Sequence, residues 1–477
     1  MNENNIKHLL VKYFKHTPTP DQEELIDKLA VFLLCFKHRP LFLLRGYAGT
    51  GKTTMVSSLV QILPILKQSF MLLAPTGRAA KVLANYSGKK AFTIHKKIYR
   101  ITTKKDGGIL LLLQKNYHKN AVFIVDEASM IPDDSRQDNS TLFSNNNLLD
   151  DLINYVYSGE KCKLIFIGDT AQLPPVGISL SPALDREYLK SNYSFSFYEH
   201  ELKQVVRQSL DSGILINATK IRMQIAEQNN TFPFFNLKNK SDVIKILGSD
   251  LEEALSDNYS FGNEEDTIIV CRSNKRANIF NQEIRKRILF REGEISSGDY
   301  LMIVKNNYFW LSPDSSAGFI ANGDIAEILK IKDIYDLYGF RFADVSIRLI
   351  DYPEEKEIDV KIMLSTIMAE TPSLSYKENG KFFDEVLKDY LDIPQRRARV
   401  EKVKNNPHFN ALQVKFAYAL TCHKSQGGQW KNVFVDQGYI TDEMINTEFM
   451  RWLYTALTRA TKKLFLINFN DKFFEES

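Results

Sequence analysis

The stretch "LFLLRGYAGTGKTT", residues 41–54, decides the fold class of this chain. Its apolar start is typical of a buried strand, and a helical pattern, "GKTTMVSSLVQILPILKQ", opens at its end. Between strand and helix, "GYAGTGKT" matches the phosphate-loop pattern, whose glycines let backbone N–H groups wrap phosphate oxygens beside a helix N-terminus. The stretch therefore predicts a nucleotide site that contains Gly46, Ala48, Gly49, Thr50, Gly51, Lys52, Thr53 and Thr54.

A second motif, "FIVDEAS", supplies the acidic half of such a site. In the phosphate loop, Lys52 can reach the β- and γ-phosphate oxygens, and the Thr53 hydroxyl can hold Mg²⁺. Asp126, at the end of the "FIV" strand, can bind the same Mg²⁺, and Glu127 can accept a proton from the attacking water. The alternative is an incidental exposed acidic pair, and the phosphate loop makes the catalytic interpretation the better one.

Short apolar runs rich in β-branched residues recur along the chain and predict buried strands. They are "LFLL" at 41, "FMLLAP" at 70, "AVFIVDEA" at 121, "KLIFIGD" at 163, "TIIVCRS" at 267, "NVFVDQG" at 432 and "KLFLINF" at 463. Helical periodicity between most of them, as in "TGRAAKVLANY", indicates parallel βαβ units and an α/β fold class. Because the runs form two groups, before residue 200 and around a long central segment, we expect two parallel-sheet domains.

Two segments depart from this βαβ rhythm. The stretch "IYRITTKKDGGILLLLQ" (98–114) has two strand-like runs joined by residues that tolerate positive φ, which predicts a protruding β-hairpin. Region 299–409 holds several strand-like pieces between polar turns, which predicts a small antiparallel barrel followed by the basic helical stretch "YLDIPQRRARVEKVKNN". The Asn- and Ser-rich stretch at 133–147 is typical of a loop.

Composition excludes several other classes of protein. The chain has 477 residues, with 62 Lys and Arg against 58 Asp and Glu, so any basic groove for a nucleic acid must be local. The four cysteines are far apart, which speaks against a zinc site or a disulfide scaffold and fits a reducing compartment. The N-terminus lacks a signal-peptide core, and the longest apolar run, "LAVFLLCF", is too short to span a bilayer. We expect a cytoplasmic protein with no membrane contact.

Two glutamines lie where a nucleotide site could use an amide. "FIGDTAQLPP" ends a predicted strand at Asp169 and places Gln172 just beyond it, where an amide can orient the hydrolytic water or report the γ-phosphate. A loop glutamine that faces solvent is the alternative. Upstream, "TPTPDQEEL" places Gln22 at a helix start, where an amide can read adenine by paired hydrogen bonds.

The site needs a positive charge to stabilise the departing γ-phosphoryl group. The candidates are Arg207 in "LKQVVRQ" and Arg459 in "WLYTALTRATKKLFLI". By residue type alone, an arginine such as Arg459 more often caps helix carbonyls or pairs with a surface carboxylate. If the two sheets face each other across the nucleotide, however, Arg459 is an arginine finger, and closure of the cleft is coupled to hydrolysis.

The motifs resemble, in order and spacing, those of a superfamily 1B DNA helicase of the RecD and Dda type. The matching motifs are "TPTPDQ", "GYAGTGKTT", "APTGRAAKVL", "TIHKKIY", "VDEASM", "GDTAQLPPVG", "LKQVVRQ", "ANGDIAEIL", "ALTCHKSQGGQW" and "LYTALTRATKKL". The resemblance implies an ATP-dependent motor on single-stranded DNA, with an AAA-type ATPase domain and a UvrD-like C-terminal helicase domain. Such motors act in DNA repair, recombination or replication.

The resemblance also implies a domain organisation. Two RecA-like parallel-sheet domains would hold ATP between them and single-stranded DNA across their top. The first would comprise residues 1–92 and 121–200, with a strand-separating pin hairpin at 93–120. The second would comprise 201–298 and 410–477, with an SH3-like barrel and helical insertion at 299–409.

Site roles follow from the same resemblance. Gln22 would contact adenine, Gln172 would sense the γ-phosphate, and Arg207 and Arg459 would stabilise the transition state. With Lys52 and Glu127 these complete the implied catalytic set, and Thr53 and Asp126 would bind Mg²⁺. The residues implied to lie along the DNA are Pro75, Thr76, Arg78, Thr93, His95, Thr421, His423 and Ser425. Their small hydroxyls and basic groups suit phosphate contacts, although a structural role is an equal alternative for the two histidines.

The chain departs from the family pattern in places. Related helicases often carry a glutamate after "HKSQG" that binds the ATP ribose, whereas this chain has Gly428 and Gln429 there. A glutamine still donates hydrogen bonds but brings no charge. We expect a compact monomeric motor whose partners are single-stranded DNA and its junctions with duplex. The basic region within 350–408 could bind a protein or the duplex, or form a solvated helix face.

Three functions stay open at this point. The first is a DNA helicase, for which the resemblance implies movement 5′ to 3′. The short interval between residues 53 and 126 supports this polarity, because it leaves no room for the helical insertion of UvrD-like motors, which run the other way. The second is a superfamily 1 helicase on RNA, since nothing in the sequence reads a 2′-hydroxyl. The third is a DNA-bound ATPase switch that recruits partners through 299–409. A nuclease is a weaker idea, because the sequence shows no carboxylate and lysine cluster outside the nucleotide motifs.

Overall fold

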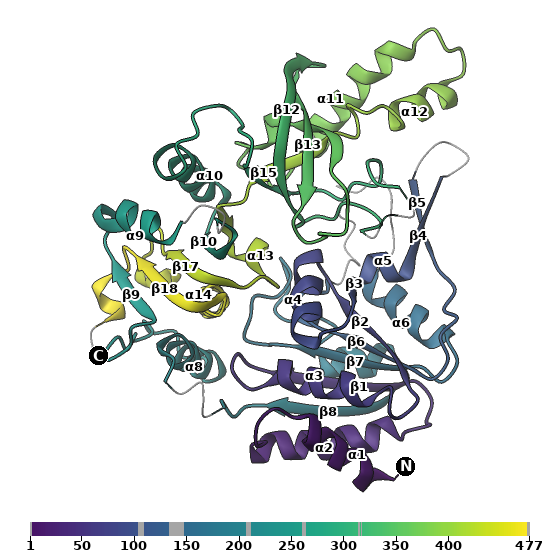
Figure 1. Cartoon of the computed structure of the whole chain (residues 1–477), viewed down its shortest axis with the longest axis vertical. Coiled ribbons are helices and arrows are strands. Elements are labelled where there is room, and N and C mark those ends of the chain that lie inside the picture. The colour runs from purple at the N-terminus through teal and green to yellow at the C-terminus, as the bar shows by residue number, and fades with distance from the viewer. Residues whose placement is uncertain are drawn as a thin grey trace.

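The phosphate-loop strand belongs to a parallel sheet near the N-terminus of the chain (Figure 1). The computed structural model describes residues 2–103, 109–132, 147–206, 211–259, 264–312, 315 and 317–474, without the side chains of 101–103 and 109–111. The first sheet has six strands in the order β3-β2-β6-β7-β1-β8, all of them parallel. Their bounds are β1 Pro40–Gly46, β2 Ser69–Ala74, β3 Ala91–Thr93, β6 Ala121–Val125, β7 Lys163–Gly168 and β8 Ser196–Leu202.

Helices cover both faces of this sheet because its strands are apolar on both sides. In β1, Phe42 and Leu44 face one core while Leu41 and Leu43 face the other, as strand geometry requires. The helices on the Phe42 side are α1 Glu3–Tyr13, α2 Pro20–Leu33, α3 Lys52–Ile62 and α4 Gly77–Ser87. Those on the other side are α5 Ile94–Ile98, α6 Leu148–Ser158 and α7 Arg186–Asn192.

The second parallel sheet has five strands in the order β16-β10-β17-β18-β9. Their bounds are β9 Val243–Ile246, β10 Thr267–Cys271, β16 Ala419–Thr421, β17 Trp430–Asp436 and β18 Ala460–Ile467. Helices α8 Gly213–Ala226 and α14 Thr447–Leu457 pack on one face, and α9 Leu251–Asn258 and α10 Asn274–Glu283 on the other. The short helix α13 Cys422–Ser425 follows β16. The prediction of two parallel-sheet domains in an α/β fold is confirmed.

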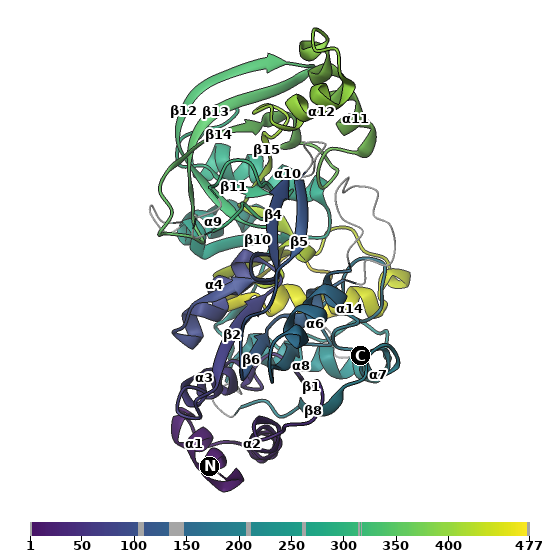
Figure 2. The same ribbon diagram turned by 90° about the vertical axis from the view of Figure 1, so that its right-hand side faces the viewer.

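A closed five-stranded barrel lies beyond the second sheet (Figures 1 and 2). Its strands are β11 Tyr300–Ile303, β12 Ile325–Leu337, β13 Phe340–Leu349, β14 Ile358–Met363 and β15 Leu412–Phe416. The prediction of a purely antiparallel barrel is wrong in one pair, because β14 and β15 run parallel. A long connection through α11 Tyr376–Leu387 and α12 Arg396–Lys404 makes this parallel pairing possible.

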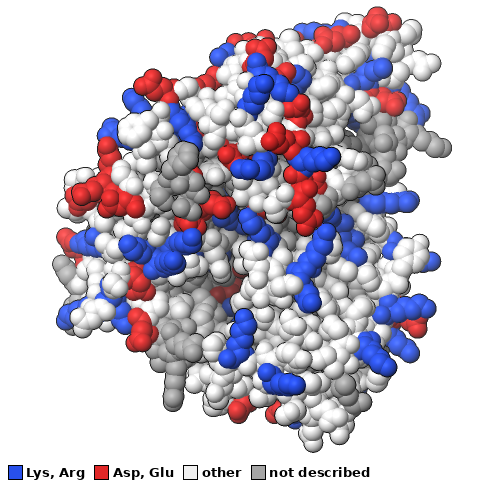
Figure 3. Space-filling model, in the orientation of Figure 1, with Lys and Arg blue, Asp and Glu red and all other residues white. Residues whose placement is uncertain are grey.

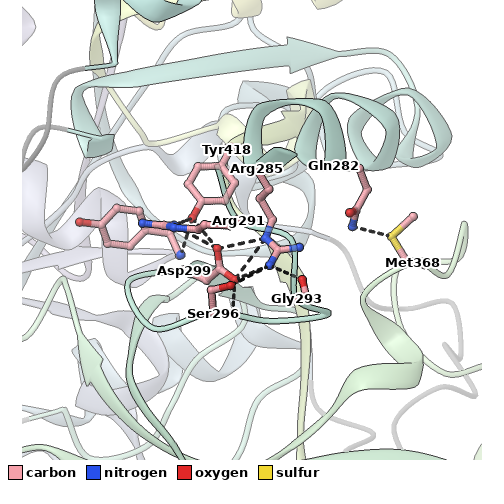
Figure 4. Close-up of polar contacts among 9 residues, drawn as sticks. Gln282, Arg285, Arg291, Gly293, Ser296, Asp299, Met368 and Tyr418 are labelled. Atoms are coloured by element: carbon pink, nitrogen blue, oxygen red, sulfur yellow. Dashed lines mark hydrogen bonds and ion pairs between the residues drawn. The ribbon is translucent and has the colours of Figure 1, made fainter. Parts of the chain in front are cut away.

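The barrel is joined to the second sheet by a buried ionic network (Figure 4). Asp299, which precedes β11, lies 2.9 Å from a guanidinium nitrogen of Arg285 and 3.0 Å from one of Arg291. The hydroxyl of Tyr418, between β15 and β16, donates to Asp299 at 3.0 Å and accepts from the Tyr300 backbone N–H at 3.1 Å. Residues from both bodies therefore share one buried carboxylate, which we call the barrel joint.

A β-hairpin extends from the first sheet alongside the barrel (Figure 2). Strands β4 Tyr99–Thr103 and β5 Ile109–Leu113 pair antiparallel, with Tyr99 opposite Leu113 and Thr103 opposite Ile109, so the predicted hairpin is confirmed. Its turn at 104–108 and the predicted loop at 133–146 lie outside the described residues.

Two global features agree with the composition. Positive and negative side chains are interspersed over the face drawn in Figure 3, as the small net charge leads one to expect. None of the helices in the described part of the chain combines the length and apolar character that crossing a bilayer requires.

Candidate nucleotide-binding cleft

The phosphate loop lies between β1 and α3, as the sequence predicts. Gly51 is the residue before α3 and has φ 90°, a left-handed conformation that favours glycine, and α3 has no side-chain cap. The first backbone N–H groups of the helix therefore point at the loop without a capping partner. The Lys52 ammonium donates to the carbonyls of Gly46 at 2.6 Å and Tyr47 at 2.8 Å, which keeps this cation inside the loop. Thr53 and Thr54 lie in the first turn of α3, with Thr53 exposed.

Gln22 lies against this loop rather than away from it. Its side-chain oxygen accepts from the Thr19 backbone N–H at 3.0 Å, and its side-chain nitrogen donates to the Thr50 carbonyl at 2.9 Å. The reciprocal bond from the Gln22 N–H to the Thr19 hydroxyl completes a capping box at the start of α2. Gln22 therefore both caps a helix and supports the loop, and a contact with adenine would use the remaining amide hydrogen and lone pair.

The two carboxylates of "DEAS" follow β6 at its carboxyl end. Asp126 accepts hydrogen bonds from the Tyr86 hydroxyl and, at 2.9 Å, from the Glu127 N–H. Glu127 has φ 52°, a left-handed backbone that is uncommon for a residue with a side chain and costs about 1–3 kcal/mol. Such strain occurs at sites where function fixes the direction of a side chain.

Glu127 faces charges from both parallel-sheet domains. Burial raises the pKa of Glu127 to about 7, the Asp126 and Asp169 carboxylates add to this effect, and the cations of Arg459 and Lys52 oppose it. A carboxylate whose pKa lies near neutrality suits a general base. Because Arg459 belongs to the second domain, the charges that act on Glu127 come from both domains.

The end of β7 contributes Asp169 and Gln172. Asp169 is 1% exposed and accepts from the Ala171 N–H at 2.9 Å and from the Tyr454 hydroxyl at 2.7 Å. The Gln172 side chain is 7% exposed, and its oxygen has no hydrogen-bond partner within the described residues. The alternative of a solvent-facing loop glutamine is therefore wrong. An unpaired buried amide oxygen is costly unless a ligand or water satisfies it.

Arg459 caps helix carbonyls, as one of the two interpretations of the sequence expects. Its guanidinium donates to the Thr455 carbonyl at 3.0 Å, to the Gly428 carbonyl at 3.3 Å and to the Thr458 hydroxyl at 3.2 Å, so it does cap the end of α14. At 4% exposure it is not a surface arginine, and it also acts electrostatically on Glu127 across the cleft. A guanidinium has five N–H donors, so the three bonds leave capacity for a phosphate.

Arg207, the other predicted transition-state arginine, lies outside the described residues. The segment before it is tied to the nucleotide site. The Lys203 and Gln204 N–H groups donate to Asp21 at 2.7 and 3.1 Å, and the Val206 N–H donates to the Gly49 carbonyl at 3.0 Å. Burial raises the pKa of Asp21, but these N–H groups and His200 hold it below its usual value.

Within the described residues, one group of His and carboxylate side chains is close enough to hold a metal: Asp21, Glu24 and His200. Their atoms already have partners, because the Lys28 ammonium lies 2.7 Å from Glu24 and 3.3 Å from His200. A cation in that position occupies the place of a metal, so this group is an ion-pair network.

Three of the predicted DNA-binding threonines begin helices at strand ends. Thr76 follows β2 and accepts from the Ala79 N–H at 3.2 Å, and Thr93 follows β3 and accepts from the Lys96 N–H at 3.2 Å. Thr421 precedes α13 and has no side-chain capping bond. Backbone N–H groups and hydroxyls therefore gather at the carboxyl edges of both sheets, while Pro75 is half-buried beside Thr76.

The other predicted DNA-binding residues differ in exposure. Arg78 is half-buried, with its guanidinium 4.1 Å from the centre of the Trp430 ring, so it contacts the second sheet. Burial lowers the pKa of His95 to about 4 and keeps its ring neutral at physiological pH. His423 is exposed. Ser425 is fully buried and donates to the Cys422 carbonyl at 2.8 Å, so its hydroxyl does not reach the surface.

Gly428 and Gln429 lie beside Arg459. Gly428 offers its carbonyl to Arg459, and a Cβ on Gly428 would lie 2.4 Å from the Trp430 ring, so only glycine fits there without displacement. Gln429 is exposed and can reach a ligand.

Sequence reasoning missed two hydroxyl groups at this site. The Tyr454 hydroxyl accepts from the Ala48 N–H at 2.8 Å, in addition to its bond to Asp169, and Tyr86 contacts Asp126. Tyr454 stands inside the quoted "LYTALTRATKKL", where its apolar neighbours predict a core residue. The structure is needed to show that the Tyr454 hydroxyl contacts the other domain.

Comparisons with known proteins agree with this geometry. The family model described as an AAA domain matches residues 19–228, and the UvrD-like helicase C-terminal domain matches residues 416–467. An uncharacterized protein of Acanthamoeba polyphaga mimivirus is 24% identical over 93% of this chain and 98% of its own length. The ATP-dependent DNA helicase dda of Enterobacteria phage T4 is 24% identical over 89% of this chain and 93% of its own. A Pif1 helicase structure from Bacteroides aligns at 15% identity and a TM-score of 0.47, covering 97% of this chain and 95% of that one.

Fold and site together define a P-loop ATPase in which the second parallel-sheet domain packs against the phosphate loop of the first. The two family matches occur in the order that the motifs predict and together cover more than half of the chain. The chain therefore combines an AAA domain with a UvrD-like helicase C-terminal domain and resembles DNA helicases of the RecD and Dda type.

Proposed function

We propose that this chain is an ATP-dependent DNA helicase that moves 5′ to 3′ along single-stranded DNA and separates duplex ahead of it. The observation that carries the proposal is that the second domain contacts the phosphate loop of the first through Tyr454, and that Arg459 of the second domain acts electrostatically on Glu127 of the first. A cleft whose catalytic groups come from two bodies hydrolyses ATP only when those bodies close. Repeated closure and opening of the two domains can move a DNA strand that contacts both of them.

The residues of the cleft divide the hydrolysis between them. Lys52 and the loop N–H groups bind the phosphates, and Glu127 takes a proton from the attacking water. Gln172, whose oxygen is buried and unpaired in the described structure, orients that water or contacts the γ-phosphate. Arg459 and Arg207 stabilise the charge on the departing phosphoryl group. Gln22 and Gln429 complete the contacts to adenine and ribose.

The oxygen donors of Thr53 and Asp126 fit Mg²⁺, which prefers hydroxyl, carboxylate and phosphate oxygens. When bound, the ion supplies charge neutralisation at the phosphates. The contribution of the chain is to orient the carboxylate: the Tyr86 hydroxyl and the Glu127 N–H each contact one oxygen of Asp126. Hydrogen bonds that orient a metal-binding carboxylate in this way tune its affinity for the metal.

We propose that DNA lies along the edge formed by the strand ends of both sheets. The groups there are Pro75, Thr76, Arg78, Thr93, His95, Thr421 and His423, whereas the buried Ser425 hydroxyl does not belong to this edge. Phosphates are bound there by hydroxyls, N–H groups and basic side chains, which carry no base information. The hairpin β4–β5 then acts as the pin of domain 93–120, beside the barrel of insertion 299–409 (Figure 2).

The assignment of location and partners is part of the same proposal. Buried, free cysteines at positions 35, 162, 271 and 422 support a reducing, cytoplasmic location. The exposed Arg396 and Arg397 at the start of α12 support contact with duplex or a protein through 350–408. We propose a monomer as the working motor.

The experiment measures ATP hydrolysis with Mg²⁺ in the presence of matched single-stranded DNA or RNA. We expect strong stimulation by DNA, weaker stimulation by RNA, and loss of both in Lys52→Ala. Stimulation by RNA alone would assign the motor to RNA. Hydrolysis that survives Lys52→Ala would refute the site, and hydrolysis without strand separation would indicate the partner-dependent switch.

A further inference from the structure

One buried hydroxyl links the two parallel sheets at the phosphate loop. Tyr454, in α14 of the second domain, is 1% exposed. Its hydroxyl accepts from the Ala48 N–H at 2.8 Å and donates to Asp169 at 2.7 Å. Ala48 belongs to the phosphate loop and Asp169 follows β7, so both partners lie in the first domain. A hydroxyl can accept and donate at once, whereas the ring of phenylalanine can do neither.

The same helix makes a second contact with the first domain. The Leu173 N–H donates to the Thr455 hydroxyl at 2.9 Å, and the Gln426 side chain of the second domain donates to the Leu173 carbonyl at 2.6 Å. The end of α14 is thus docked by consecutive side chains, with Tyr454 contacting the phosphate loop and Thr455 contacting the segment after Asp169.

Arg459 is rigidly connected to this docking point. Its guanidinium donates to the Thr455 carbonyl at 3.0 Å, and the Thr458 N–H donates to the Tyr454 carbonyl at 3.1 Å. A shift of Tyr454 relative to the phosphate loop therefore moves the arginine relative to Glu127.

We propose that Tyr454 is a positioning residue for ATP hydrolysis: its hydroxyl fixes α14 on the phosphate loop and so places Arg459 at the reacting phosphate. The inference rests on the proposed function. It adds a physical link from the phosphate loop and Asp169 through α14 to Arg459.

The chain offers a matched control in Tyr418. Its hydroxyl also accepts from a backbone N–H, that of Tyr300 at 3.1 Å, and donates to a buried aspartate, Asp299 at 3.0 Å. Tyr418 lies at the barrel joint, outside the nucleotide cleft (Figure 4). Loss of either hydroxyl removes a bond from a backbone N–H and a bond to a buried aspartate, and Tyr418→Phe also removes a bond from Arg291. A purely structural role therefore predicts that Tyr418→Phe is at least as damaging as Tyr454→Phe.

The test compares kcat and KM for ATP with saturating single-stranded DNA, the affinity for a fluorescent ADP, and the melting temperature. For Tyr454→Phe we expect kcat to fall roughly 10- to 100-fold, as small misplacements of catalytic groups do, while KM and ADP affinity change less than about threefold. Tyr418→Phe should lower the melting temperature and keep kcat. Parent-like kcat in Tyr454→Phe, or an equal loss in both variants, would overturn the inference.

If Tyr454→Phe does not fold, a second variant at the same docking point tests the inference. Thr455→Val removes only the hydroxyl bond from Leu173, and we expect a smaller fall in kcat with the same unchanged KM. A rise in KM with kcat retained would overturn the positioning role. If the parent protein itself hydrolyses no ATP with DNA, the proposed function fails, whereas an active parent with parent-like variants refutes this inference alone.

Discussion

The nucleotide cleft and the barrel joint use the same tyrosine arrangement in different electrostatic settings. In each, a buried tyrosine hydroxyl accepts from a backbone N–H and donates to a buried aspartate. At the barrel joint, Asp299 also forms ion pairs with Arg285 at 2.9 Å and Arg291 at 3.0 Å (Figure 4). At the cleft, the other bond to Asp169 comes from the uncharged Ala171 N–H.

This electrostatic difference indicates which of the two contacts, the nucleotide cleft or the barrel joint, can open. Separation of the barrel joint would leave charges without partners in a buried place, which is strongly unfavourable. Separation of the cleft breaks hydrogen bonds from uncharged donors, including the one from Tyr454 to the Asp169 carboxylate, and such bonds contribute about 0.5–3 kcal/mol each. We therefore expect the barrel to move with the second sheet as one body, and the two parallel sheets to move relative to each other.

The largest effect is expected on kcat when an arginine of the nucleotide cleft is removed. Arg459→Ala should lower kcat about 10³-fold, because removal of an arginine that stabilises the transition state has effects of that order. Nucleotide binding should persist through the phosphate loop. Steady-state hydrolysis with DNA checks kcat, and fluorescent ADP checks binding. If kcat stays within a few-fold of the parent, Arg459 only caps α14.

The next effect is on the barrel joint. Asp299→Asn leaves Arg285 and Arg291 without their buried counter-charge and should destabilise the fold by about 3–5 kcal/mol. Urea unfolding measures the loss. The matched control is Asp442→Asn, which breaks an exposed pair with Lys472 at 2.7 Å and should leave the unfolding midpoint near that of the parent. Equal stability of the two variants would contradict a rigid joint.

A smaller effect is expected on the pH dependence of ATP hydrolysis. The pKa of Glu127 is raised to about 7, and only its deprotonated form can act as a base. The value of kcat/KM should therefore fall roughly tenfold per pH unit below 7 and level off above it. Since the Arg459 cation lowers this pKa, Arg459→Ala should move the rise to higher pH and Arg459→Lys should largely restore it. A pH-independent profile between 5 and 8 would exclude Glu127 as the base.

Much of this architecture could be predicted from the sequence because apolar strand runs and the phosphate loop are local signals. The strands that were missed are β3, β8, β9, β15 and β16, and β15 closes the barrel beyond the predicted end of the insertion at residue 409. They are short or, like "SFYEHEL" in β8, mix polar residues into the run, and only pairing with neighbours defines them. The parallel β14–β15 pair was missed because a helical segment separates the two strands in sequence.

The site was predicted less completely than the fold. Lys52, Asp126 and Glu127 lie at one site because the parallel strands β1 and β6 end at the same edge of the first sheet, which topology makes predictable. Arg459 comes from the second domain, between α14 and β18, and its place depends on how the domains pack. The role of Tyr454 was not predictable, because its partners lie in another domain and its sequence neighbours are apolar. The burial of Ser425 likewise depends on packing around α13, which a loop motif does not reveal.

Strand separation on two matched duplexes, one with a 5′ and one with a 3′ single-stranded tail, tests the central claim most directly. The reactions contain ATP and Mg²⁺, and Lys52→Ala serves as the control. The account predicts that only the 5′-tailed duplex is unwound and that Lys52→Ala unwinds neither. Unwinding of the 3′-tailed duplex alone, or of neither by the parent protein, would contradict it.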